Sequence, residues 1–218
     1  TVAGAAKPDF RSKEMSEDCL YLNVWTPASS AEAKLPVLVY FHGGGFVSGD
    51  GSEPRYDGAN MASRGVIAVT VNYRLGAFGF LASPDAAKES LNGTTGNYGL
   101  LDQVAALRWV RDNIAQFGGD PSQVTIAGNA AGSVAVSTHM VSPLSRGLFA
   151  RAIGESGGAF APNRIWAREQ AVDAATQFST RVGAASLQQL RSLPARTLLT
   201  ASTQLKFAPG SPIFWPHV

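Results

Sequence analysis

The chain has 218 residues, of which 45% are hydrophobic and 16% are charged. This composition is typical of a globular protein and excludes a disordered one. The net charge is only +2, and no Lys/Arg cluster indicates a nucleic-acid partner. The apolar run Leu35–Phe41 is too short to span a bilayer, so we expect no membrane span.

Short runs of β-branched and aromatic residues alternate with helical patterns along the chain. Four runs predict strands: Leu20–Trp25, Val37–Phe41, Val66–Val71 and Gln123–Ala127. Apolar residues three or four positions apart predict a helix over Leu101–Phe117, which Gly118, Gly119 and Pro121 would end. Further helices are expected after Gly128 and from about Arg164 to Val182. The alternation predicts an α/β fold, a mainly parallel sheet with helices on both faces.

A glycine-rich segment, His42 to Phe46, comes directly after the strand Val37–Phe41. Ester hydrolysis passes through a tetrahedral oxyanion, which fixed N–H donors stabilise. Glycines let backbone N–H groups come close to a substrate because no Cβ stands in the way. A glycine turn without chemistry is the alternative, and the next motif favours the oxyanion loop.

The segment from Val124 to Gly132 has every feature of a nucleophile elbow except the serine. Such an elbow needs a strand, a sharp turn and a helix, with small residues beside the nucleophile. The strand leads to Gly128, and a helix of small residues is expected to follow and to run through Val136. The nucleophile position between them is Ala130.

A second segment, Gly154–Gly158, matches the G-x-S-x-G pattern around Ser156. We predict that Ser156 is not the nucleophile, because the residues from Gly157 to Pro162 are a poor helix start. An elbow without a following helix lacks the dipole and amide that help to hold an oxyanion. Ser133, on the helix beyond the elbow, is a weaker candidate still.

Taken in order, these motifs resemble the type-B carboxylesterase family, which includes cholinesterases and bacterial para-nitrobenzyl-type esterases. The similar segments are Ser16–Asn23, His42–Phe46, Asn72–Phe80, Gly96–Gln103, Asn113–Pro121 and the elbow, and the resemblance ends near Pro162. It implies an α/β-hydrolase fold, incomplete in this chain because family members are much longer. Residues 1–218 would be the N-terminal part of one catalytic domain, and a cap or substrate-side helical region would start at about 163. A secreted or periplasmic location is favoured by the resemblance alone.

The resemblance also implies roles for individual residues. The backbone amides of Gly44, Gly45 and Ala131 would form the oxyanion hole beside Ala130. Supporting positions would be Gly43, Gly128, Gly132 and Ser156, the last through its hydroxyl. An Arg74–Asp102 ion pair would be structural. No metal or cofactor is expected.

The single cysteine, Cys19, cannot form a disulfide within this chain. Its residue type favours a small, buried apolar side chain. The family resemblance offers the alternative that it is half of a disulfide whose partner precedes Thr1.

In α/β hydrolases the triad acid and histidine follow the nucleophile in the chain. The candidates after Ala130 are Glu155, Glu169, Asp173, His139 and His217. His139 is expected on the helix after the elbow, as a packed or a surface histidine, and His217 has no preceding strands to build the later sheet. We therefore expect the acid and the histidine to lie on a missing C-terminal segment or chain.

The expected function is hydrolysis of small carboxylic esters through an acyl-enzyme. With Ala130 this form would be inactive but able to bind substrate. A deliberate Ser-to-Ala substitution is favoured over a naturally inactive relative, because the oxyanion loop and elbow glycines are complete. A noncatalytic, cholinesterase-like interaction protein is the competing function. A lone dinucleotide-binding domain is disfavoured, because Gly43–Gly45 lacks the G-x-G-x-x-G spacing.

Overall fold

The structure is a computed structural model that describes residues 11, 14–91, 93–160, 165–204 and 215–217. The chain divides into two compact units. The first unit comprises residues 1–44, 49–72 and 105–158, and the second comprises residues 45–48, 73–104 and 159–218.

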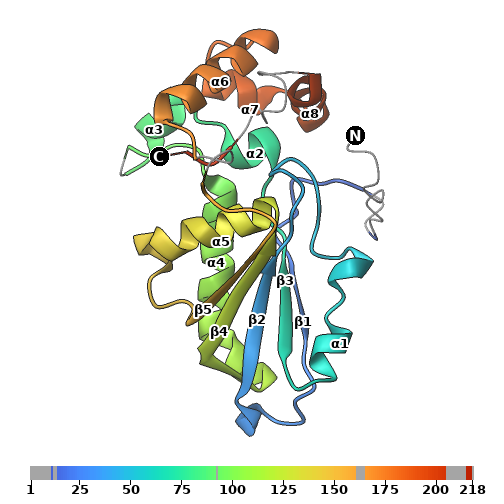
Figure 1. Ribbon diagram of the computed structural model, residues 1–218. Helices are drawn as coiled ribbons and strands as arrows, with labels where there is room; N and C mark the ends of the chain where they lie inside the picture. Colours follow the sequence, from blue (N-terminus) through green and yellow to red (C-terminus); the bar gives the residue numbers. More distant parts are fainter. Residues whose placement is uncertain (1–10, 12–13, 92, 161–164, 205–214, 218) are drawn as a thin grey trace. The chain divides into compact units, whose positions relative to one another are not determined.

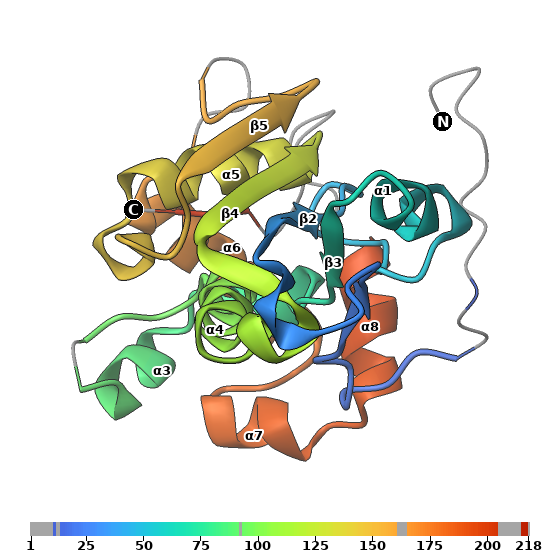
Figure 2. The ribbon, with the colours of Figure 1, turned by 90° about the horizontal axis from the view of Figure 1, so that it is seen from below.

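The first unit contains one five-stranded sheet. Its strands are β1 (Leu22–Trp25), β2 (Leu35–Phe41), β3 (Ile67–Val71), β4 (Gly119–Asn129) and β5 (Arg151–Glu155). They lie in the order β1-β3-β2-β4-β5 (Figure 1), and only β1 is antiparallel to its neighbour. Figure 2 shows β3, β2, β4 and β5 from below. All four predicted strands are present, and the predicted α/β class with a mainly parallel sheet is confirmed.

Helical segments cover both faces of this sheet. Neighbouring residues of a strand point to opposite faces of the sheet. The contacts of Tyr40 and Phe41 in β2 therefore show which elements cover each face. The Phe41 ring lies 5.3 Å from the ring of His139, on helix α5 (Ala131–Val141). The Tyr40 ring lies 5.0 Å from Tyr56, in the 3-10 turn η2 (Pro54–Tyr56) that precedes α1 (Ala59–Ala62). The prediction of helices on both faces is therefore confirmed.

The predicted helix over Leu101–Phe117 is observed as α4 (Tyr98–Asn113), continued by the 3-10 turn η3 (Ile114–Phe117). Its start was predicted too late, since the amide of Leu101 already bonds to the carbonyl of Asn97. The predicted end is right. Gly118 closes the helix in a left-handed conformation, φ 79°, that glycine adopts without strain.

Strand β4 is longer than the predicted Gln123–Ala127 because an irregular stretch is included at its start. Leu35 pairs with Gly119, but Val37 pairs with Val124, so the strand bulges between the two pairs. Pro121 lies in this bulge, where its missing N–H costs no ladder hydrogen bond. The Asp120 carboxylate closes the bulge by accepting bonds from the Ser122 amide at 2.9 Å and hydroxyl at 2.6 Å.

Short helices make up most of the second unit. They are α2 (Gly76–Phe80), α3 (Pro84–Glu89), α6 (Arg168–Arg181), α7 (Leu187–Ser192) and α8 (Ala195–Gln204). Helix α6 matches the helix predicted from about Arg164 to Val182, although residues 161–164 lie outside the described ranges. Phe46 packs among three aromatic rings of the same unit, Tyr73, Phe80 and Trp215. Throughout the described ranges, no helix is long and apolar enough to cross a membrane.

Two leucines of α4 allow a test of which face of this helix is buried. Leu107 is fully buried and Leu101 is 42% exposed. We expect Leu107→Ala in the complete protein to lower the free energy of unfolding by about 2–5 kcal/mol, since it leaves a cavity. Leu101→Ala should change it by less than about 1 kcal/mol. Urea denaturation of both variants measures the difference, and equal losses would contradict the observed orientation of α4.

Candidate active site

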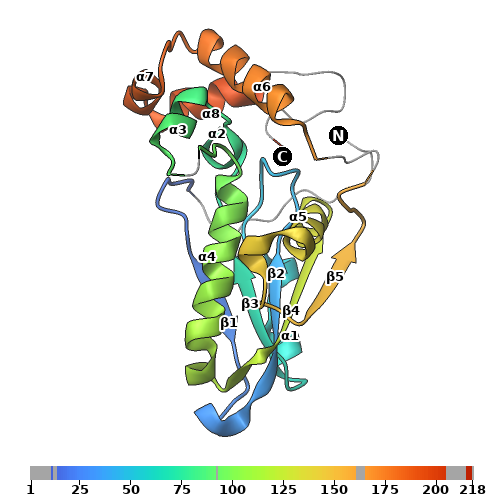
Figure 3. The ribbon, with the colours of Figure 1, turned by 90° about the vertical axis from the view of Figure 1, so that its left-hand side faces the viewer.

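Strand β4 leads into helix α5 (Figure 3). Ala130 lies between the two, after Asn129 and before Ala131. Its backbone has φ 53° and ψ −115°, a conformation that costs a residue with a Cβ about 1–3 kcal/mol. The predicted strand, strained turn and helix are therefore confirmed. Such strain persists only where the surrounding structure enforces it.

Close backbone packing enforces the turn. A Cβ on Gly128 would collide with the backbone of Gly132, and a Cβ on Gly132 would collide with the carbonyl of Phe41. The two glycines thus allow β4, α5 and the end of β2 to approach one another. The amide of Ala130 donates to the Glu155 carbonyl at 2.9 Å, which ties the turn to the neighbouring strand β5.

The glycine loop after β2 meets this turn. A Cβ added to Gly43 would lie 2.8 Å from the Asn129 carbonyl oxygen and 3.5 Å from the Ala130 Cβ. Gly44 follows with φ 110°, and Gly45, which belongs to the second unit, has φ 65°. Both values lie in the region that favours glycine. Of the predicted oxyanion residues, Gly44 and Ala131 share the first unit with Ala130.

His42 supports the same loop from the interior. Its side chain is buried, and Nδ1 donates to the Gly43 carbonyl oxygen at 2.7 Å. Burial lowers the pKa of His42 to about 4, so the imidazole is neutral near pH 7. A Cβ on Gly49 would lie 2.5 Å from this Nδ1, so the returning loop also packs on the ring.

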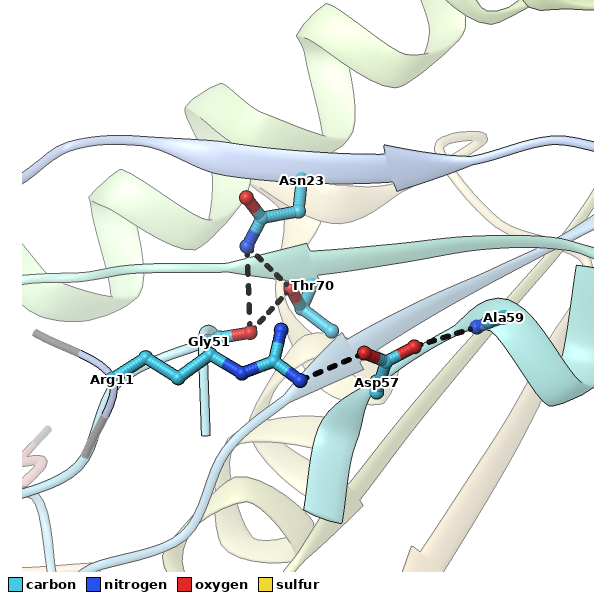
Figure 4. Close-up of polar contacts among 6 residues, drawn as sticks. All are labelled: Arg11, Asn23, Gly51, Asp57, Ala59 and Thr70. Atoms are coloured by element: carbon cyan, nitrogen blue, oxygen red, sulfur yellow. Dashed lines mark hydrogen bonds and ion pairs between the residues drawn. The ribbon is translucent and has the colours of Figure 1, made fainter. Parts of the chain in front are cut away.

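The loop is anchored further along at Gly51 (Figure 4). The Gly51 carbonyl accepts from Thr70 Oγ1 at 2.7 Å and from Asn23 Nδ2 at 3.4 Å. The Gly51 amide donates to Asn72 Oδ1 at 2.7 Å. Sequence reasoning missed this network, although Asn23 and Asn72 lie in segments that carry the family resemblance.

Asp57, just before α1, bonds to the first residue of that helix and to Arg11. Its Oδ1 accepts from the Ala59 amide at 3.0 Å, and its Oδ2 pairs with Arg11 at 2.9 Å (Figure 4). The backbone bond and Arg11 hold the pKa of the Asp57 carboxyl below its usual value. Because Arg11 is exposed, its ion pair contributes little to stability.

The expected Arg74–Asp102 ion pair is present in the second unit. Arg74 Nε and Nη2 donate to the two carboxylate oxygens of Asp102 at 2.8 and 2.7 Å. The Arg74 amide adds a third bond at 2.9 Å. Asp102 is buried. The three bonds hold the segment after β3 to α4, so the ion pair has a structural role.

Ser156 follows β5 in a similarly sharp turn, with φ 54°. Residues 157–160 are not helical, as predicted, so Ser156 lacks the following helix of an elbow. Ser156 is exposed, whereas Ser133 on α5 is fully buried.

The histidines and acids after Ala130 lie in different surroundings. His139 lies on α5, the helix after the elbow, as predicted. It is buried in the first unit, with Nδ1 2.8 Å from the Ser145 hydroxyl. His217 is buried in the second unit, where Nε2 lies 2.9 Å from the Thr95 carbonyl oxygen. Glu155 ends β5, whereas Glu169 and Asp173 lie on α6. In the described parts of the chain, no three His, Cys, Asp or Glu side chains are grouped to hold a metal ion.

The burial predicted for Cys19 is wrong. The side chain is half-buried, because it precedes β1 and lies outside the sheet core. The alternative of a disulfide to a residue before Thr1 stays a prediction.

A mainly parallel sheet with a strained turn between strand and helix, facing a glycine loop, defines an α/β hydrolase. The chain matches the carboxylesterase family profile over residues 3–218, and it belongs to that family. It is 51% identical to the fumonisin B1 esterase of Sphingopyxis macrogoltabida over 152 residues, which cover 70% of this chain and 28% of that protein.

A para-nitrobenzyl esterase and a solved structure extend the comparison. The enzyme of Bacillus subtilis (strain 168) is 45% identical over 203 residues, covering 91% of this chain and 40% of the enzyme. A solved structure of a PNB esterase superposes with a TM-score of 0.82 at 42% identity, covering 98% of this chain and 46% of the other. The α/β-hydrolase fold is thus shown, and the chain spans less than half the length of these relatives.

The buried His139 generates a prediction on pH. Burial lowers its pKa from the ordinary 6.5 to about 4, so the unfolded state takes up a proton first as the pH falls. The stability that depends on neutral His139 is complete above pH 6.5 and is lost as the pH falls towards 4.

Replacing His139 by Asn keeps an amide nitrogen near the Nδ1 position but removes the titration. In the complete protein, His139→Asn should reduce the loss of unfolding free energy in this range by about 1.4 kcal/mol per pH unit. Urea denaturation at several pH values measures the slope. An unchanged slope would show that His139 does not titrate on unfolding.

Proposed function

We propose that the chain is the nucleophile-bearing part of a serine carboxylic ester hydrolase in which Ala130 replaces the nucleophile. This form binds ester substrates but does not cleave them. The observation that carries the proposal is the backbone of Ala130, φ 53° and ψ −115° between β4 and α5. An alanine gains nothing from this strained conformation, whereas a nucleophile in it is presented at the top of the sheet.

The catalytic form would use a serine at position 130. Its oxygen would attack the ester carbonyl with a histidine as base, and water would later hydrolyse the acyl-enzyme. A methyl group allows no covalent step, and loss of the nucleophile typically lowers kcat by about 10⁶.

The oxyanion hole would be formed by the backbone amides of Gly44, Gly45 and Ala131. Ala131 is the first residue of α5. The first amides of a helix have no intrahelical partner, and the helix dipole favours negative charge at that end. Gly43 supports the assignment, because a Cβ there would lie 2.8 Å from the Asn129 carbonyl oxygen and would push the loop away from the turn.

The remaining triad members would come from a C-terminal segment or chain beyond residue 218. His139 and His217 are both buried and bonded to neighbouring groups, which gives them structural roles. In this proposal residues 1–218 are part of one catalytic domain, and the region from about 163 begins the cap. The names of the relatives, esterases of fumonisin B1 and para-nitrobenzyl esters, support a small-molecule ester as substrate.

Ala130 itself favours a second candidate, a noncatalytic interaction protein on the same fold. The complete glycine loop and the strained backbone at the turn favour the hydrolase. A downstream acid followed by a histidine in the remaining sequence would decide for the hydrolase.

One prediction of the proposed function concerns the nucleophile. Ala130→Ser in the complete protein should restore hydrolysis of a short p-nitrophenyl ester, by about 10⁴-fold or more. A serine-reactive phosphonate should then label residue 130. The label should stay there when Ser156→Ala is added, whereas labelling of Ser156 would contradict the assignment.

A further prediction concerns the sheet edge at β5. All five residues of β5 are exposed, Ile153 to 46%, and β5 pairs only with β4 among the described strands. An exposed edge strand invites association. Residues 1–218 expressed alone should therefore self-associate or unfold without cooperativity, as judged by light scattering and urea denaturation. A soluble monomer with a sharp two-state transition would contradict the need for a partner segment.

A further inference from the structure

Two neighbouring strands end in similar left-handed turns. Ala130 follows β4 with φ 53°, and Ser156 follows β5 with φ 54°. The amide of Ala130 donates to the carbonyl of Glu155, the residue before Ser156, at 2.9 Å. The β5 turn, residues 154–157, is therefore bonded directly to the strained residue of the elbow.

Two glycines let the β5 turn lie against the elbow. A Cβ on Gly157 would lie 2.8 Å from the Ala130 carbonyl oxygen, and a Cβ on Gly154 would lie 2.6 Å from the Ser133 hydroxyl. Real Cβ atoms do not approach so closely, so a side chain at either position would push the turn away. The space at Gly154 is filled by the Ser133 hydroxyl.

Ser133 makes the second bond between the two segments. It is the third residue of α5 and is fully buried, and its Oγ donates to the Gly157 carbonyl at 2.7 Å. Ala130 and Ser133 lie at the start of the same helix, and Glu155 and Gly157 lie in the same turn. The two bonds therefore staple the β5 turn to the elbow at two points.

The energies of the strain and of the Ser133 bond are comparable. The left-handed conformation of the elbow is strained and persists only where the surrounding structure enforces it. Removing a buried hydroxyl that leaves its acceptor unsatisfied costs free energy of the same order as this strain. Loss of the Ser133 bond is thus large enough to shift the elbow towards relaxed conformations.

We infer that Ser133 is a positioning residue that holds the β5 turn against residue 130 and so maintains the elbow. Its burial and its bond to Gly157 rule out a role as nucleophile. The consequence for catalysis rests on the proposed function, but the consequence for the backbone does not.

The backbone consequence is tested in the protein with Ala130. Site-resolved hydrogen exchange of the residue 130 amide, which bonds to Glu155, should be about tenfold faster in Ser133→Ala, as loss of a buried hydrogen bond implies. The matched control is Ser137→Ala. Ser137 lies on the same helix, but its hydroxyl donates within α5, to the Ser133 carbonyl at 3.1 Å. Exchange at residue 130 should stay within about twofold in this control.

Ser133→Cys is a second variant that keeps the inference testable if Ser133→Ala does not fold. A thiol has a similar shape but is a weak donor, so exchange at residue 130 should lie between those of the parent and Ser133→Ala. The inference would be overturned if the residue 130 amide exchanged at the same rate in Ser133→Ala, Ser133→Cys and Ser137→Ala as in the parent protein.

The catalytic consequence is tested in the Ala130→Ser protein. Adding Ser133→Ala should lower kcat about tenfold per phosphonate-titrated site and leave KM unchanged, since the nucleophile is displaced but the substrate contacts remain. Adding Ser137→Ala should change neither. If Ala130→Ser is inactive while exchange responds to Ser133, the proposed function fails and the positioning role stands. An active protein with unaltered kcat in Ser133→Ala would overturn the catalytic part.

Discussion

The candidate site depends on one constraint, the contact of three backbone segments where no Cβ intervenes. Gly128, Gly132 and Gly43 bring β4, α5 and the loop after β2 together around Ala130. Since the strain at residue 130 is imposed by this packing, it does not depend on the chemical nature of that side chain. This explains how an alanine occupies a conformation that suits a nucleophile.

The sequence predicted the parts of the fold in which buried apolar residues repeat regularly. The run IAVTV of β3 is buried at every position, and the stripe through Leu107 and Val110 identifies α4. The helix start was missed because Tyr98 and Gly99 add nothing to that stripe. Strand β5 is not among the four predicted strands, since its exposed residues carry no pattern of burial.

The candidate site was predictable where one short segment carries the geometry, as in the elbow around Ala130. It was not predictable where distant residues meet. The bonds that join Asn23, Thr70 and Asn72 to Gly51 link positions far apart in the chain, and no local spacing indicates them. Cys19 was misplaced for a related reason, because residue type alone does not show where the sheet begins.

The anchoring of Gly51 has a consequence for how such proteins diverge. The side chains that fix the loop come from β1, from β3 and from the residue just after β3, and none of them would touch a substrate-binding amide directly. Substitutions at Asn23 or Thr70 could therefore alter how the loop presents its amides while every recognisable motif stays intact. Two homologues with identical glycine loops and elbows need not share a substrate preference.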